Sequence, residues 1–346
     1  MHYLGPLRLF LAISVAAFHI WTPLFPDTGR HAVMGFFAIS GFLITMIANE
    51  VYRDRPGAFL LNRALRIYPT YWVCLILALA TAVLFPRTIA EEVWLTTPWP
   101  SGPSGWLTNI AIFEIGSNGR TITQTWSLYI ELIMYLVVGL ATFRSLALTL
   151  IGFVVSIGWA FYGMFHMAEY PFYFYPMGTA FVFFSGSLAY FASKRIRVPR
   201  TAALICLALY GVSMFGLPHF MRVEQYAGPI PHFFLLISVA SVAIILTALP
   251  TFPKPSPSIE AAARLAGDFS YPLFLLHLAC AVPVVSVFGP SRPVAFFGSL
   301  ILAAPISYCL IRAENSLEGI RSLIRMGSLG RLTSSKLASA RAESQS

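Results

Sequence analysis

Residues 6–19 read PLRLFLAISVAAFH, an apolar stretch with an arginine near its start and a histidine at its end. About 20 mostly apolar residues cross the hydrocarbon layer of a bilayer, so residues 4–24 are predicted to form a membrane-spanning helix. The eleven residues from Arg8 to His19 advance a helix by three turns plus about 20°, which predicts both side chains on one face, roughly 16 Å apart. A ligand lying along that face would meet both groups.

The composition extends this interpretation to the whole chain. Of its 346 residues, 57% are hydrophobic and 11% are charged, and the mean hydropathy is +0.73. These values exclude a water-soluble domain of this length. An all-α polytopic membrane protein is therefore predicted, with about ten transmembrane helices near residues 4–24, 31–48, 68–85, 126–143, 145–165, 172–192, 201–220, 232–250, 269–288 and 293–312.

The distribution of Lys and Arg predicts the topology. With the N-terminus inside, 17 of these residues fall in inner loops and the C-terminal segment and 5 in outer loops, with Arg8 left aside. Because basic residues concentrate on the cytoplasmic side, both termini are expected in the cytoplasm and the chain in the inner or plasma membrane. The net charge of +9 then reflects topology and anionic lipid, without a nucleic-acid partner. The four cysteines form neither a disulfide framework nor a zinc spacing.

Outside the spans, the sequence predicts one transmembrane domain, residues 1–325, and a disordered basic tail, residues 326–346. After the second span, Arg63 and Arg66 lie at i, i+3 on a short amphipathic stretch. They are either an interfacial anchor or a site for a phosphorylated cytosolic ligand, because guanidinium groups suit phosphate. Residues 86–125 form a long external segment whose tryptophans are either interfacial anchors or sugar-stacking groups.

Four ionisable residues fall inside predicted spans: Arg8, His19, Glu131 and His277. Each is expected to be paired or to face a cavity. Glu131 lies at a depth similar to that of His19, where a carboxylate would fix the imidazole tautomer and stabilise its protonated form. It would alternatively pair with an arginine for folding. His277 is either a second polar ligand of the same cavity or a packed histidine.

Purely structural roles are the alternatives for the two ionisable residues of the first helix. Arg8 alone would serve as the orienting charge of the first span, and His19 alone as a neutral imidazole bonded to a carbonyl. On the second span, GFFAISGFLIT (35–45) carries Gly35, Ser40 and Gly41, which predict close packing against the first helix. Ser40 is not expected to be a nucleophile, because no Gly-x-Ser-x-Gly elbow surrounds it.

Taken together, these pieces resemble the acyltransferase-3 family of integral-membrane acyltransferases, whose members acetylate O-antigens, exopolysaccharides, Nod factors and some macrolides. The resemblance covers residues 4 to about 312 in the same order. It rests on the Arg-to-His spacing of the first span and on the motifs FFAISGFLIT, FLLNRALRIYPTYW, TWSLYIE and FSYPLFLLH. One motif alone would be weak, whereas five in register are specific.

The resemblance implies acetyl-CoA or another acyl-CoA as cytosolic donor and an acceptor hydroxyl presented from the membrane or its outer side. It implies that His19 is the catalytic base, with Arg8 as its essential partner along the donor path. Arg63 and Arg66 match the family's basic pair and are expected to bind the CoA phosphates. From its position in the ninth span, and not from the resemblance, His277 is added as a third candidate for cofactor binding. Glu131 matches the first acidic residue after the Trp-Ser-Leu motif.

One departure from the family is clear. Many members have a second glutamate and a glutamine after that first acid, where this chain has Leu132 and Ile133. The sequence is therefore similar to the exopolysaccharide-acetylase branch, and no role of the second glutamate transfers. The external hydrolase-like domain that some members carry is not expected from this sequence.

The predicted function is a membrane-bound O-acyltransferase, without a metal, that moves an acyl group, expected to be acetyl, from acyl-CoA to a hydroxyl of a cell-surface or lipid-linked carbohydrate. His19 would act as a base or as a transient acyl carrier. The alternatives are a transporter or flippase of lipid-linked sugars and transfer to a small molecule such as a macrolide. A scaffold would leave the four buried ionisable residues unexplained. A homo-oligomer is left open.

Overall fold

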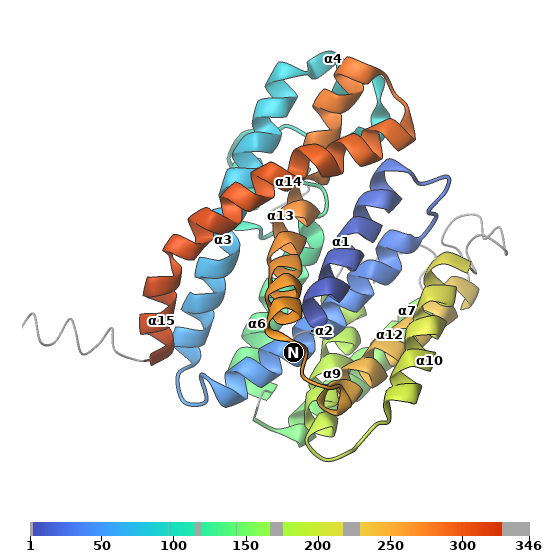
Figure 1. Cartoon of the computed structure of the whole chain (residues 1–346), viewed down its shortest axis with the longest axis vertical. Helices are drawn as coiled ribbons and strands as arrows, with labels where there is room; N and C mark the ends of the chain where they lie inside the picture. Colours follow the sequence, from blue (N-terminus) through green and yellow to red (C-terminus); the bar gives the residue numbers. More distant parts are fainter. Residues whose placement is uncertain are drawn as a thin grey trace, which may run out of the picture.

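The chain folds into a bundle of helices in the computed structural model (Figure 1), which describes residues 3–95, 97–114, 119–142, 144–166, 176–216 and 229–326. No strand occurs in these ranges, so the all-α prediction is confirmed for them. The helices are α1 (Leu4–Ile20), α2 (Thr28–Glu50), α3 (Pro56–Leu84), α4 (Pro86–Glu91), α5 (Gly102–Ala111), α6 (Thr125–Val137), α7 (Leu146–His166), α9 (Pro176–Ser193), α10 (Arg200–Gly211), α12 (Pro229–Ala248), α13 (Pro257–Phe288), α14 (Arg292–Ser316) and α15 (Glu318–Met326).

The first helices of the chain lie at the centre of the bundle. α1 packs against both α2 and α13, and the other face of α2 packs against α9 and α12. Figure 1 shows α7, α9, α10 and α12 grouped on one side of this centre and α3, α14 and α15 on the other. The helix that carries Arg8 and His19 is therefore enclosed by helices from distant parts of the sequence.

Glycine allows α2 and α9 to meet at the level of their backbones. A Cβ added at Gly41 would lie 2.0 Å from the carbonyl oxygen of Phe183, and one at Gly186 would lie 1.9 Å from that of Ala38. The predicted close approach is thus present, but for Gly41 the partner is α9 and not α1. Gly35 does face α1, through Leu11. Small residues set how near the helices come in each case.

Seven helices of the described chain are long and apolar enough to cross a membrane. They are α2, α3, α6 with its π-helical extension to Thr142, α7, α12 with its extension to Thr251, α13 and α14. α1 and the helix Arg200–Gly216 are apolar but shorter, and α9 is not among the seven. Ten spans and two cytoplasmic termini stay predictions.

Two helices begin earlier than the sequence suggested. α3 continues from Pro56 through Pro69, and α13 continues from Pro257 through Pro272 and Pro283. The stretch with Arg63 and Arg66 is therefore one helix with the following span, and residues 257–268 are one helix with the predicted span 269–288. Prolines are tolerated inside membrane helices because neighbouring groups satisfy the freed carbonyls.

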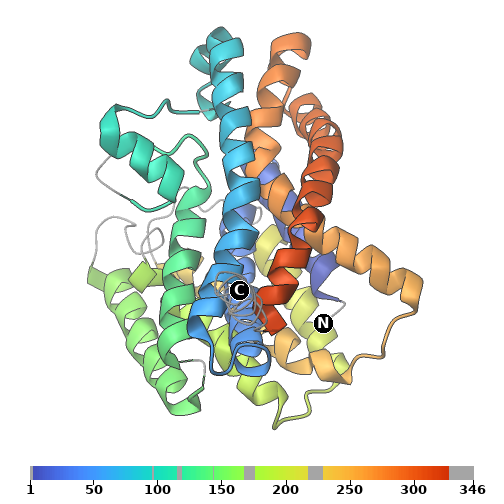
Figure 2. The same ribbon diagram turned by 90° about the vertical axis from the view of Figure 1, so that its left-hand side faces the viewer.

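The segment between α3 and α6 folds back on α3, seen in Figure 2 beside the long blue-to-cyan helix. Tyr68 and Trp72 donate hydrogen bonds to the carbonyls of Ala111 (2.8 Å) and Ile110 (3.0 Å), and Tyr71 donates to that of Asn109. These are the terminal carbonyls of α5, which have no partner within their own helix. The aromatic motif of α3 thus caps α5.

The predicted basic tail, residues 326–346, lies outside the described residues except for Met326. Before it, α15 is a further amphipathic helix that the sequence analysis did not predict, and it packs on the first turns of α3. Asn62 donates to the carbonyl of Arg321 (3.1 Å), and Arg55 donates to the carbonyls of Ile324 (3.2 Å) and Arg325. Helix α15 is therefore held against the first turns of α3, close to Arg63 and Arg66.

Candidate active site

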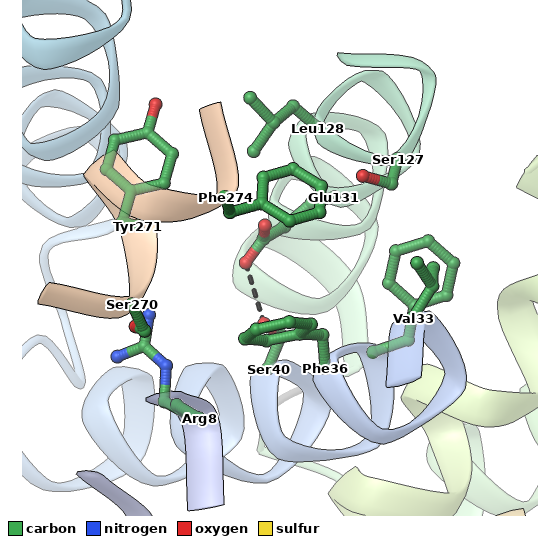
Figure 3. Close-up of a pocket in the computed structure, with 11 residues that line it drawn as sticks. Arg8, Val33, Phe36, Ser40, Ser127, Leu128, Glu131, Ser270, Tyr271 and Phe274 are labelled. Carbon is green, nitrogen blue, oxygen red and sulfur yellow. Dashed lines mark hydrogen bonds between the residues drawn. The ribbon is translucent and has the colours of Figure 1, made fainter. Parts of the chain in front are cut away.

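Four helices from the N-terminal, central and C-terminal parts of the chain line a cavity of about 50 Å³ (Figure 3). α1, α2, α6 and α13 each contribute at least one polar or charged side chain to an otherwise apolar wall. The lining consists of Arg8, Val33, Phe36, Phe37, Ser40, Ser127, Leu128, Glu131, Ser270, Tyr271 and Phe274. Two residues predicted from sequence, Arg8 and Glu131, are thus brought to one cavity.

Glu131 is held by two hydroxyl groups. Its Oε1 atom accepts hydrogen bonds from Ser40 Oγ (2.7 Å) and from Tyr135 Oη (2.6 Å). Two donors converging on one carboxylate oxygen suit the ionised acid, which only accepts. Figure 3 shows the bond to Ser40 on the cavity wall. Ser40, expected only as a small packing residue, therefore also positions Glu131.

Arg8 presents its guanidinium to the same cavity from α1 (Figure 3). The charges of Arg66, Glu131 and Asp268 act on it, yet within the described ranges it forms no hydrogen bond or ion pair. Five donors in a fixed fork are thus available to a ligand. An orienting charge would not need to face a cavity inside the bundle, so the geometry favours the ligand interpretation of Arg8.

His19 lies in the last turn of α1 and pairs with His277 of α13. Its Nδ1 atom is 2.8 Å from Nε2 of His277, and the two ring planes lie within 4° of each other. The centroids are 5.1 Å apart, which equals the N···N separation plus the two distances from ring centre to nitrogen. The rings are therefore joined edge to edge in a common plane, the geometry of an N–H···N hydrogen bond.

This pairing corrects two expectations. Glu131 was predicted to orient His19, but its hydrogen bonds go to Ser40 and Tyr135, and His277 occupies the position beside His19. His277 was expected as a ligand of the cavity, but it is fully buried and does not line it. Phe274 connects the two places, because it lines the cavity and its ring centroid lies 6.5 Å from that of His277.

Arg63 and Arg66 lie on the first half of α3, near α15. Arg63 stands 6.0 Å over the ring of Phe59, and its buried Nε has no hydrogen bond in the described chain. Arg66 forms neither a hydrogen bond nor an ion pair with any described residue. The charge of Arg321 from α15 acts on Arg63, which makes a group of three guanidiniums. Such a group suits a multiply charged anion.

The acidic residues that pair with Arg321 come from α14 and α15. Arg321 pairs with Glu314 (3.0 Å) and Glu318 (3.2 Å), and Glu318 also pairs with Arg325. Burial would raise the pKa of Glu318, but the hydrogen bond from Arg325 and the charges of Arg321 and Arg66 lower it below its usual value. Burial and the charge of Arg66 lower the pKa of Arg321. Arg321 was missed at the site because it was counted only as a topological charge.

Metal binding finds no support in the described ranges, where no group of three or more His, Cys, Asp or Glu side chains is placed to hold an ion.

Comparison with known proteins identifies the class of this bundle. The family model described as "Acyltransferase domain" matches residues 1–312, so the chain belongs to this acyltransferase family. It is therefore an acyltransferase, and the name of one relative below supports O-acetyl transfer.

Two curated proteins are similar over most of their length. The exopolysaccharide production protein ExoZ of Rhizobium meliloti (strain 1021) is 27% identical over 340 residues, which cover 88% of this chain and 95% of that protein. An O-acetyl transferase of Shigella phage Sf6 is 25% identical over 297 residues, covering 81% of this chain and 80% of that protein. No solved structure gives a significant match.

Proposed function

We propose that the chain is a multi-pass inner-membrane O-acyltransferase that transfers an acetyl or other short acyl group from acyl-CoA to a hydroxyl of a cell-surface or lipid-linked carbohydrate. The observation that carries the proposal is the placement of α1, which presents Arg8 to an internal cavity and His19 to a buried histidine partner. The carbohydrate acceptor is inferred from the relatives, one named for exopolysaccharide production and one for O-acetyl transfer.

The donor would bind by its phosphates to the guanidinium group on α3. Arg63 and Arg66 have donors that no described residue uses, and Arg321 adds a third charge beside them. Forked guanidiniums bind phosphate oxygens in pairs, so three of them suit the phosphates of CoA. Arg8 is near enough to Arg66 for the two charges to act on each other, which supports a path for the acyl-pantetheine arm from α3 toward the cavity.

In the proposed reaction, Nε2 of His19 removes the proton of the acceptor hydroxyl. The oxygen attacks the thioester carbonyl, the C–S bond breaks, and the departing sulfur takes the proton from His19. The products are an O-acyl ester and free CoA. Nε2 is the available nitrogen, because Nδ1 is engaged with His277 and no described residue bonds to Nε2. The variant in which His19 itself is transiently acylated uses the same atom.

Labelled acetyl-CoA tests this proposal. Membranes that contain the full chain are incubated with it, and both free CoA thiol and label in the carbohydrate fraction are measured. Wild type is expected to release thiol and transfer label, and His19→Ala to do neither while remaining in the membrane. His166→Ala, on an exposed histidine of α7, is the matched control and should behave as wild type.

The rival function is a transporter or flippase of lipid-linked sugars, with Arg8 and Glu131 lining the path. It predicts movement of the sugar that does not depend on acyl-CoA. Thiol release by wild type and not by His19→Ala would exclude a transporter as the sole function. A small-molecule acceptor such as a macrolide would appear as label that leaves the carbohydrate fraction.

A further inference from the structure

We infer that His277 is a positioning residue that fixes the tautomer of His19, so that Nε2 of His19 carries the free lone pair. This inference rests on the proposed function, in which His19 is the base. It differs from the donor-binding role that the sequence suggested for His277. Two independent observations carry it: the geometry of the His19–His277 pair and the surroundings of the second ring nitrogen of His277.

The pair itself permits two arrangements of one hydrogen. Either Nδ1–H of His19 donates to Nε2 of His277, or Nε2–H of His277 donates to Nδ1 of His19. The 2.8 Å separation and the common plane of the rings fit both equally. In the first arrangement Nε2 of His19 is an unprotonated acceptor, and in the second it carries the hydrogen and is not a base.

The other nitrogen of His277 decides between them. Its Nδ1 is buried and forms no hydrogen bond in the described chain, while the backbone carbonyls of Leu273 and Phe274 on the preceding turn of α13 act on the ring and Nε2 faces His19. Carbonyl oxygens only accept, so a lone pair on Nδ1 would face oxygen lone pairs in a dry interior. The hydrogen of neutral His277 therefore resides on Nδ1, and Nε2 is left to accept from His19.

The turn of α13 that provides these carbonyls is fixed in place. Gln124, immediately before α6, donates from Nε2 to the carbonyls of Phe274 (2.8 Å) and Leu275 (3.1 Å). Helix α13 also packs directly on α1. Within the described residues no carboxylate bonds to either histidine, so the helix backbone takes the role that an acid has in other histidine-based sites.

The second ring also serves the step in which His19 gains a proton. When Nε2 takes the hydroxyl proton, the imidazolium keeps its Nδ1–H bonded to Nε2 of His277. The charged donor makes that hydrogen bond stronger than it is in the neutral pair. His277 neither gains nor loses a proton in the cycle, and it touches neither donor nor acceptor.

Substitution of His277 by Asn or Gln separates the positioning role from a purely structural role. The side-chain amide of Asn lies where Nδ1 of histidine lies, and that of Gln lies where Nε2 lies. His277→Gln keeps an acceptor for His19 Nδ1–H, whereas His277→Asn removes it. With acetyl-CoA as the varied substrate, His277→Asn is expected to lower kcat at least about 10-fold with KM within about twofold of wild type. His277→Gln is expected to recover most of that loss.

His31→Gln is the matched control for the loss of a buried histidine bond. His31 is buried on α2, and its Nδ1 lies 2.7 Å from Ser238 Oγ, a bond that Gln does not reproduce. A comparable fall in melting temperature is expected for His31→Gln and His277→Asn in the purified full chain, with kcat lowered only in the latter.

Several outcomes overturn the inference. It fails if His277→Asn keeps the wild-type kcat, if it raises KM and leaves kcat unchanged, if Gln recovers no more activity than Asn, or if His31→Gln loses as much activity. In each of these cases wild type still consumes acetyl-CoA and the proposed function stands. If wild type consumes no acetyl-CoA, the proposed function and this inference are both overturned.

Discussion

Replacing Gly41 by alanine tests whether the backbone contact between α2 and α9 sets the geometry of the cavity. The new Cβ would lie 2.0 Å from the carbonyl oxygen of Phe183, whereas ordinary contact begins at 3.4 Å. The obstacle is backbone and has no rotamer to change. The two helices must therefore separate locally by about 1.4 Å.

That displacement acts directly on the cavity, because Ser40 immediately precedes Gly41 and bonds to Glu131. A misplacement of about 1 Å in a catalytic site costs on the order of 100-fold in rate. Overpacking of this kind also costs about 1–3 kcal/mol of stability. Gly41→Ala is therefore expected to lower acetyl transfer roughly 100-fold and to reduce the melting temperature by several degrees.

Gly158→Ala provides the control. Gly158 lies in α7, and no atom lies within 4 Å of a Cβ added there. The same substitution at this site is expected to leave activity unchanged and to cause no loss of stability. Activity of Gly41→Ala within twofold of wild type, at an unchanged melting temperature, would refute the reasoning.

Three further predictions follow from the site. Glu131→Gln is expected to leave the chain in the membrane but lower kcat at least about 10-fold, while Tyr135→Phe, which removes one of two hydrogen bonds to the acid, should have a smaller effect in the same assay. Arg66→Ala is expected to raise KM for acetyl-CoA about 10-fold or more, since a charge-assisted bond contributes about 1.5–3 kcal/mol; Arg66→Lys should recover part of it, and the exposed Arg264→Ala should change neither constant. Because the pKa of Glu318 is lowered in the folded chain, its contribution to holding α15 is present above the usual carboxyl pKa of about 4.3 and lost as the pH falls through the folded value. Protection of the α15 amides against hydrogen exchange, measured relative to the intrinsic rate at each pH, should therefore fall in acid in wild type, and Glu318→Gln should remove that fall.

The amphipathic α15 was not predicted. The long apolar helices were largely predictable from sequence, because a run of about 20 apolar residues is typical of a membrane-spanning helix. Their starts were less so at α3 and α13, where Pro69 and Pro272 lie inside continuous helices. A proline ends a helix in water more readily than in a membrane protein, so the rule used for the boundaries did not apply there.

The shared helix of Arg8 and His19 was also predictable, since it depends only on helical spacing, and α1 confirms it by running unbroken from Leu4 to Ile20. The residues that Arg8 and His19 meet in the folded chain were not predictable. His277 is 258 positions from His19, and such a contact depends on how whole helices pack. Ser40 lies in the motif FFAISGFLIT, which was recognised, but it was interpreted only as a small residue that allows close helix packing. Its hydroxyl group was not expected to bond to Glu131. Glu318, Arg321 and Arg325 form a visible i, i+3, i+7 charge pattern that would have predicted α15.

The tyrosines and tryptophan of α3 that bond to the end of α5 bear on how this enzyme class diversifies. The hydrogen bonds from Tyr68, Tyr71 and Trp72 to the α5 turn all end on main-chain carbonyls, so they do not depend on which side chains that turn carries. Substitutions on α5 can thus leave this attachment intact, provided that the helix ends at the same register.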